Sequence, residues 1–391
     1  MKKALVILMA LSMVFAAFAD EPAVKNEIAE FTGSASVTWG VDLDAKKTGF
    51  QNDASANLKF TLISSGDKST TGDGVWGELK IKYGDAEEFD GGAWGAKTAA
   101  VDFAKIHLND MIAIGITAGD NLYGGYKPTL AVFSDNGHFA TDSVGGAVTQ
   151  GITVEVALPD LLNFNLEFRS KPQYQDNYGI GAEVALKAVE NLNFSVGFGI
   201  DLFGGNPWGL AIGADYKLGL SDTMYLKPQG GYSMTNADNS GKIAAALLLG
   251  WGDENQDTNI KYISKKVSDG FSIGTEIALD GDVQVPLCVG IWDSKFVENL
   301  KAGVQFHVND LADFALNTLA IEFAYDLGGI KPAVAFAIDD AGDLGLNATK
   351  LYVGVDFTGF VDNTTFTLAY ESADLANSGL GTINLTAKIS F

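Results

Sequence analysis

The chain has 391 residues, of which 47% are hydrophobic, and carries a formal net charge of −23. So negative a chain repels the phosphates of nucleic acid, which argues against nucleic acid as a partner. The single cysteine, Cys288, excludes an internal disulfide. It falls in a strand pattern, where we expect a small apolar side chain rather than a reactive thiol.

The amino terminus has the pattern of a secretion signal. Two lysines precede an apolar stretch over Ala4–Phe18, and Ala17-Phe18-Ala19 supplies the small residues that signal peptidase needs. We therefore predict that residues 1–19 are a cleaved signal peptide, that the mature chain begins at Asp20, and that 20–30 form a short segment before the first strand. Because residues 1–19 contain two lysines and no acid, cleavage would change the net charge from −23 to −25.

Alternating apolar and polar residues recur along almost the whole mature chain. The longest apolar run, Ile243–Trp251, is far shorter than the roughly 20 residues that a transmembrane helix needs. Alternation with a period of two indicates β-strands, here roughly 16–20 of them, a size class that encloses an aqueous channel. The predicted strands are Phe31–Leu43, Ala54–Leu62, Val75–Tyr83, Ile152–Leu158, Leu162–Phe168, Ile180–Ala188, Leu192–Ile200, Trp208–Leu218, Met224–Met234, Ile243–Trp251, Phe271–Leu279, Val283–Ile291, Leu300–Val308, Leu319–Leu327, Pro332–Ile338, Leu351–Phe357, Phe366–Tyr370 and Thr382–Phe391. Val101–Leu108, Ile112–Ala118 and Ile260–Val267 alternate less clearly and are weaker candidates.

The connections between these strands are unequal in length. Pro159-Asp160 stands between two alternating runs and predicts a tight hairpin. Short turns on one rim and longer loops on the other are the pattern of outer-membrane barrels. Counting strands back from Phe391 does not bring the turns at Asp280–Asp282 and Gly328-Gly329 to the same rim, so we expect one misassigned strand around Asp253–Gly270. The longer connections are Ser64–Gly74, Gly84–Lys97, Gly119–Gly151, Trp251–Gly270 and Asp339–Lys350.

The last predicted strand, Thr382–Phe391, alternates throughout and ends on an aromatic residue. Ile383, Leu385 and Ile389 share one face, and Thr382 and Lys388 share the other. A final strand ending in Phe resembles the assembly signal of bacterial outer-membrane β-barrels. The fold class predicted is therefore all-β, a transmembrane antiparallel β-barrel with short periplasmic turns and longer external loops.

The polar faces of the predicted strands carry many ionised side chains. Such groups cannot occupy a dry core, since burying each unpaired one costs several kcal/mol or more. They need contact with water. In a barrel they would line a water-filled channel, with the apolar faces toward lipid; in a soluble β-sandwich they would lie on the solvent-exposed surface, with the apolar faces packed against each other. The candidate pore-lining residues are Glu155, Glu167, Arg169, Glu183, Lys187, Asp215, Lys217, Glu276, Lys301, Gln305, His307, Glu322, Asp326, Asp356, Glu371 and Lys388.

Two segments resemble a known family. Trp39–Asn52 (WGVDLDAKKTGFQN) and Ala324–Phe336 (AYDLGGIKPAVAF) are similar to strand regions of the treponemal major outer sheath proteins, which include the Treponema pallidum repeat proteins. Two further stretches are degenerate copies of part of the second segment and indicate internal repetition: Tyr123–Phe133 (YGGYKPTLAVF) and Leu226–Gly230 (LKPQG).

The resemblance implies a spirochaete surface-exposed porin, often a homotrimer, that also binds host matrix proteins such as fibronectin and laminin. Some members of that family have an amino-terminal periplasmic part before the barrel, which would place a boundary near Gly145–Gly151. Because the first third of this chain alternates as well as the last third, we favour one continuous barrel over residues 31–391.

The sequence offers little for catalysis or for cofactor binding. Only three histidines occur, His107, His138 and His307, and no Cys/His cluster or regularly spaced acidic loop indicates a metal site. We therefore expect no enzyme activity, no cofactor and no resident metal.

The function predicted is passive diffusion of small hydrophilic solutes and ions through a weakly cation-preferring outer-membrane porin that is also a surface antigen, embedded in outer-membrane lipid. The alternatives are an adhesin with a plugged barrel and a soluble secreted β-sandwich antigen.

Overall fold

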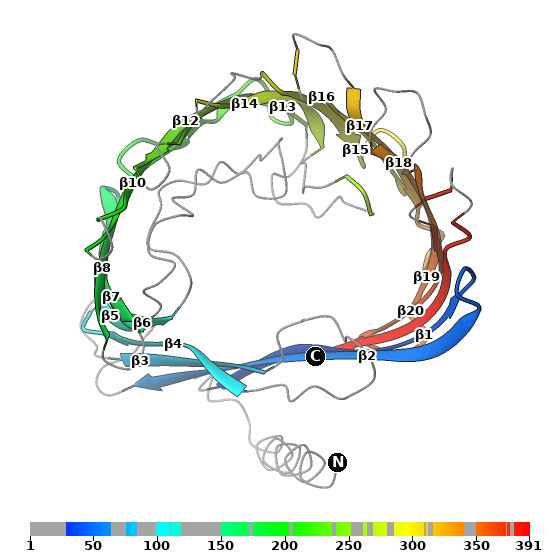
Figure 1. The fold of residues 1–391 in the computed structure, drawn as a ribbon, viewed down its shortest axis with the longest axis horizontal. Helices are drawn as coiled ribbons and strands as arrows, with labels where there is room; N and C mark the ends of the chain where they lie inside the picture. Colours follow the sequence, from blue (N-terminus) through cyan, green and yellow to red (C-terminus); the bar gives the residue numbers. More distant parts are fainter. Residues whose placement is uncertain are drawn as a thin grey trace, which may run out of the picture.

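The protein folds into one closed β-barrel, seen along its axis as a ring of strands (Figure 1). The structure, a computed structural model, describes residues 29–63, 76–83, 99–109, 111–118, 150–171, 175–202, 206–236, 240–251, 261–263, 269–279, 285–308, 310–311, 316–339, 349–372, 374–375 and 379–391. The strands are β1 (Ala29–Asp42), β2 (Lys47–Ile63), β3 (Trp76–Tyr83), β4 (Ala99–His107), β5 (Ile112–Ala118), β6 (Gln150–Leu158), β7 (Leu162–Lys171), β8 (Gln175–Leu186), β9 (Leu192–Asp201), β10 (Trp208–Tyr216), β11 (Leu218–Gly219), β12 (Tyr225–Thr235), β13 (Gly241–Gly250), β14 (Gly270–Ala278), β15 (Leu287–Asp293), β16 (Leu300–Val308), β17 (Leu316–Tyr325), β18 (Ile330–Asp339), β19 (Thr349–Thr358), β20 (Thr364–Ser372) and β21 (Thr382–Ser390).

Apart from β10 and β11, which do not pair with each other, consecutive strands pair antiparallel, so the sheet is an up-and-down meander. The short β11 continues β10 along the same partner, β12, which makes the barrel a closed sheet of 20 strands. This count lies within the predicted range, and the hairpin predicted at Pro159-Asp160 joins β6 to β7. The prediction of an all-β antiparallel barrel is confirmed, and the alternative of a two-sheet sandwich is wrong.

The barrel closes between its first and last strands. β1 pairs with β21 from Ser34 opposite Ser390 to Asp42 opposite Thr382. Gly33 and Phe391 exchange backbone hydrogen bonds of 2.6 and 3.0 Å, and the ring of Phe391 stacks on Phe31 with centroids 5.0 Å apart. Closure leaves no unpaired sheet edge, which is the condition for a sheet to cross a bilayer.

Alternation separates the side chains into an apolar outer face and a polar inner face. Residues 261–263 lie inside the ring (Figure 1) and contact Glu322 on β17 and Glu371 on β20. The face of the sheet that carries these two carboxylates is therefore the concave, inner one. The opposite face exposes large apolar side chains around the ring, which suits contact with lipid and would be unstable in water. These residues include Val37, Trp39, Ile114, Ile116, Ile152, Leu166, Phe168, Phe198, Ile243, Leu247, Phe271, Ile291, Phe323, Val334, Val353, Leu368, Leu385 and Ile389.

Tight turns gather on the rim where Phe391 lies, which we call the turn rim. Asp160, Asn191, Asn299 and Asn363 adopt positive φ there, between 57° and 64°, and Gly328 does so at 77°. Asn, Asp and Gly tolerate this left-handed conformation best, so these residues allow the chain to reverse within a few positions.

The antiparallel order explains the difficulty in counting turns. The connection between β17 and β18 lies on the turn rim, whereas the connection between β14 and β15 lies on the opposite rim, which we call the loop rim. Two of the longer connections, 64–75 and 251–269, leave the turn rim rather than the loop rim. The predicted strand over Ile260–Val267 is wrong at residues 261–263, the described part of this range. These residues form a bend inside the ring (lime-green segment in Figure 1).

No helix among the described residues is long and apolar enough to cross a bilayer. The predicted signal peptide, residues 1–19, lies outside the described residues, as do Tyr123–Phe133 and the proposed boundary near Gly145–Gly151 apart from its last two residues. β1 to β5 belong to the same closed sheet as the later strands.

Candidate functional site: the charged inner face of the barrel

Most of the candidate pore-lining residues share the inner face. They lie on β6 to β8, β10, β14, β16, β17 and β19 to β21. Lys187, Lys217 and Asp326 instead lie just outside or between strands at the turn rim. The inner-face residues are Glu155, Glu167, Arg169, Glu183, Asp215, Glu276, Lys301, Gln305, His307, Glu322, Asp356, Glu371 and Lys388.

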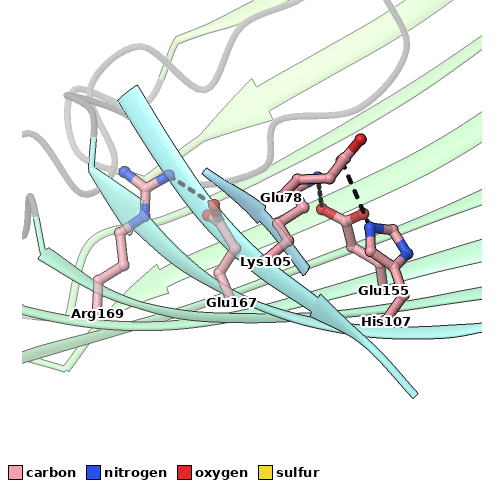
Figure 2. Close-up of polar contacts among 6 residues, drawn as sticks. All are labelled: Glu78, Lys105, His107, Glu155, Glu167 and Arg169. Atoms are coloured by element: carbon pink, nitrogen blue, oxygen red, sulfur yellow. Dashed lines mark hydrogen bonds and ion pairs between the residues drawn. The ribbon is translucent and has the colours of Figure 1, made fainter. Parts of the chain in front are cut away.

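Charges of opposite sign lie side by side where β2, β3 and β4 meet. Lys59 Nζ is 2.9 Å from Glu78 Oε1, and His107 Nε2 is 3.5 Å from the other oxygen, Glu78 Oε2. The His107 ring stacks on Trp76, directly opposite in the strand register, with centroids 3.6 Å apart. Figure 2 shows Glu78 and His107 pointing toward each other. Glu78 therefore has a partner on each of the two neighbouring strands, Lys59 on β2 and His107 on β4.

A lysine of β4 crosses β5 to reach β6. Lys105 Nζ lies 2.5 Å from Glu155 Oε1, and the two side chains keep 26% and 29% of their surface exposed (Figure 2). The intervening residue on β5 is Gly115, where an added Cβ would lie 3.1 Å from Lys105 Cγ and 2.7 Å from Thr153 Oγ1. Because Gly115 has no side chain, the Lys105 side chain has room to cross β5 and reach Glu155.

The ion pair on β7 is more enclosed. Arg169 donates a hydrogen bond of 2.6 Å from Nη2 to Glu167 Oε1, and the two side chains are only 6% and 2% exposed (Figure 2). Glycines lie opposite both of them on β8, Gly181 beside Glu167 and Gly179 beside Arg169. A buried pair of this kind is costly to break, because the remaining charge stays out of water.

A second buried pair joins β10 to β12. Lys227 Nζ is 3.2 Å from Asp215 Oδ1, and Asn193 of β9 donates a hydrogen bond of 2.9 Å to the same oxygen. Sequence reasoning selected Asp215 but not Lys227. The alternation within β12 could have found it, since Lys227 has the same parity as the inward Gln229.

Asp326 belongs to the turn between β17 and β18 rather than to the inner wall. Its Oδ1 accepts a hydrogen bond of 2.9 Å from the backbone N–H of Gly328, and its Oδ2 lies 3.1 Å from Lys331 Nζ. The Gly328 hydrogen bond, followed by Lys331, holds the pKa of Asp326 below its usual value. Its role is therefore in the turn.

The inner face carries charges of both signs, together with hydrogen-bond donors and acceptors, that could contact a solute inside the barrel. Lysines on β2, β4, β12, β13 and β16 interleave with carboxylates on β3, β6, β7, β14 and β17. Within the described ranges, no group of three or more His, Cys, Asp or Glu side chains is placed to hold a metal ion. Cys288 lies on β15 and is buried, as expected for a small apolar strand residue.

No protein-family model matches this chain. The major outer membrane protein MspA of Treponema maltophilum is 40% identical to it over 194 residues, which cover 44% of this chain and 34% of that protein. The major surface protein MspTL of Treponema lecithinolyticum is 36% identical over 189 residues, covering 44% and 31%. This chain spans about a third of the length of the curated relatives it matches.

Among solved structures, the fold is similar to two engineered variants of the porin of Rhodopseudomonas blastica. They match at TM-scores of 0.38 and 0.39 with 12% and 11% identity, and cover 93% of this chain and all of theirs. The strand pairing of the chain itself establishes the closed barrel. The identity to the two Treponema proteins confirms the predicted resemblance: over the aligned part, the chain is similar to treponemal major outer membrane and surface proteins.

Proposed function

We propose that this protein is an outer-membrane porin through which small hydrophilic solutes and ions diffuse passively. The observation that carries the proposal is the closed barrel of 20 strands with ionised side chains on its inner face. Barrels of 16–18 strands enclose an aqueous channel, and only a wet interior keeps so many charged groups hydrated.

The apolar outer face and the names of the relatives support a location in the outer membrane. In outer-membrane barrels the short turns face the periplasm and the longer loops face outward. We therefore place the turn rim, with Phe391, in the periplasm and the loop rim at the cell surface. Residues 1–19 would direct export as a signal peptide.

The inner-face residues named above would line the pore, and its electrostatics would favour cations weakly. Lysines offset the charge of many of the inner carboxylates, so the inner wall formed by the described strands has no large net charge of either sign. The negative excess of the chain instead comes largely from the connections between strands, in acid-rich stretches such as 84–98 and 252–260. An excess of acidic groups on a channel protein raises the local concentration of cations.

Single-channel recording of the refolded mature protein in a planar bilayer tests this proposal. We expect stable conductance steps and, in a salt gradient, a reversal potential of the sign that indicates cation preference. A sealed bilayer, despite a barrel whose gel migration changes on heating, would contradict the diffusion channel.

Surface exposure leads to a second candidate function, adhesion. One relative is named a major surface protein, and the family resemblance implies a homotrimer that binds host matrix proteins and acts as a surface antigen. Chemical cross-linking in detergent should give trimers, and immobilised fibronectin or laminin should retain the folded protein. Matrix binding by a protein that gives no conductance would favour the adhesin with a plugged barrel.

A further inference from the structure

A short piece of the connection between β13 and β14 docks on the inner wall of the barrel. The backbone N–H groups of Lys261, Tyr262 and Ile263 all donate to one oxygen, Oε1 of Glu322 on β17. The N···O distances are 2.9 Å for Lys261 and 2.8 Å for Ile263, and Glu322 is 0% exposed. Consecutive N–H groups that converge on an anion form a strong binding nest, so Glu322 tethers this segment to the wall.

The side chain of Lys261 extends the docking across three more strands. Its Nζ lies 2.7 Å from Glu371 Oε2 on β20 and 5.4 Å from the ring centroid of Tyr352 on β19. Lys261 and Glu371 keep 35% and 34% of their side-chain surface exposed, so this pair faces the open part of the interior.

Ile263 anchors the other end of the segment in an apolar cluster. It is 2% exposed and belongs to one cluster with Trp292 and Cys288 of β15. The wall is shaped for this packing at Gly303 on β16, where an added Cβ would lie 1.8 Å from Trp292 Cε3 and 2.8 Å from Ile263 Cδ1. Apolar side chains on the inner face are thus covered by a chain segment rather than by water.

We propose that residues 261–263 are a constriction element of the pore, held by the Glu322 tether, and that Lys261 sets the charge preference at this point. This inference rests on the proposed porin function. The connection leaves and rejoins the wall at the turn rim, so the narrowing is built from that side. Lys261 would oppose the passage of cations next to Glu371, and its removal would make the pore more cation-selective.

Cys288 provides a native reporter of docking, because it is the one cysteine of the chain and is 2% exposed in the same cluster as Ile263. The rate of its reaction with a small water-soluble maleimide should be low in the wild type. We expect Ile263→Ala and Glu322→Ala to raise it roughly tenfold or more, since losing one buried apolar side chain, or one hydrogen bond to a charged group, already shifts an equilibrium by about that factor. Glu276→Ala, whose carboxylate pairs with Lys242 away from the segment, is the matched control.

Folding of each variant is checked by its heat-dependent gel migration. Ile263 lies outside the strands, so Ile263→Ala should leave the barrel wall intact even if Glu322→Ala does not fold. Equal labelling rates in the wild type, Ile263→Ala and Glu276→Ala would overturn the docking.

Conductance then tests the constriction. Ile263→Ala should increase single-channel conductance, and Lys261→Gln should move the reversal potential toward stronger cation selectivity. Unchanged conductance and selectivity in a conducting barrel whose Cys288 has become reactive would overturn the role of the segment in the pore. If even the wild type does not conduct, the porin proposal fails, whereas the labelling still decides whether Glu322 and Ile263 hold the segment.

Discussion

Two arcs of the inner wall neutralise their charges in different ways. On the arc from β2 to β7, here the ladder arc, ionised side chains pair with one another within a strand or across one or two strands, as Lys105 does with Glu155. On the arc from β13 to β20, here the docked arc, Glu322 is completely buried and its hydrogen bonds come from a chain segment far away in the sequence.

The comparison shows that the register of a barrel can position its own ion pairs, but cannot cover an apolar patch on its inner face. Trp292, Leu248 and Ile263 are each at most 2% exposed on the docked arc. An apolar side chain that faces a wet interior gains stability only when another part of the chain removes it from water. The docked arc therefore needs an inserted segment, whereas the ladder arc satisfies its charges within the sheet.

The largest expected effect is that of Trp292→Ala on the docked arc. Removing a buried tryptophan costs about 3–5 kcal/mol, because a cavity remains where the ring was. Trp76→Ala on the ladder arc should cost about 1–2 kcal/mol, since that ring is only half-buried in its stack on His107. Urea unfolding in lipid vesicles measures both losses, and similar values would show that the two arcs do not differ in packing.

A smaller difference should appear within the ladder arc. Arg169→Met should lower the free energy of unfolding by about 3 kcal/mol, because Glu167 is then left buried with less compensation. Lys105→Met should cost less than about 1 kcal/mol, because Glu155 remains accessible to water. Urea unfolding of the two variants against the wild type checks this, and an equal cost would mean that burial does not set the strength of these pairs.

The smallest effect belongs to the turn at Asp326, outside both arcs. Its pKa in the folded protein is lowered from 3.8, so its stabilising contribution is present above pH 3.8 and disappears as the pH falls through the lower folded value. The wild type should therefore be slightly more stable than Asp326→Asn at pH 6, and the two should converge in stability as the pH drops well below 3.8. A difference that persists unchanged at the lowest pH would contradict this assignment.

Most of the strands and several inner-face residues could be predicted from the sequence. Alternation places Glu167, Arg169 and Asp215 on one face of their strands, and the structure puts them there. Lys105 and Lys227 obey the same alternation and could have been added by parity alone. The strand over Ile260–Val267 was predicted wrongly because a short apolar stretch looks the same whether it pairs in a sheet or packs inside the barrel.

The sequence by itself determined the all-β class, the approximate number of strands and the division of side chains between two faces, because a period of two is a local property of the chain. Only the tertiary structure decided which charges become partners. The pairing of β1 with β21 closes the ring, and the tether between Glu322 and residues 261–263 joins positions that no local pattern relates. Such contacts depend on the curvature and register of the whole sheet, so they appear only once the barrel has closed.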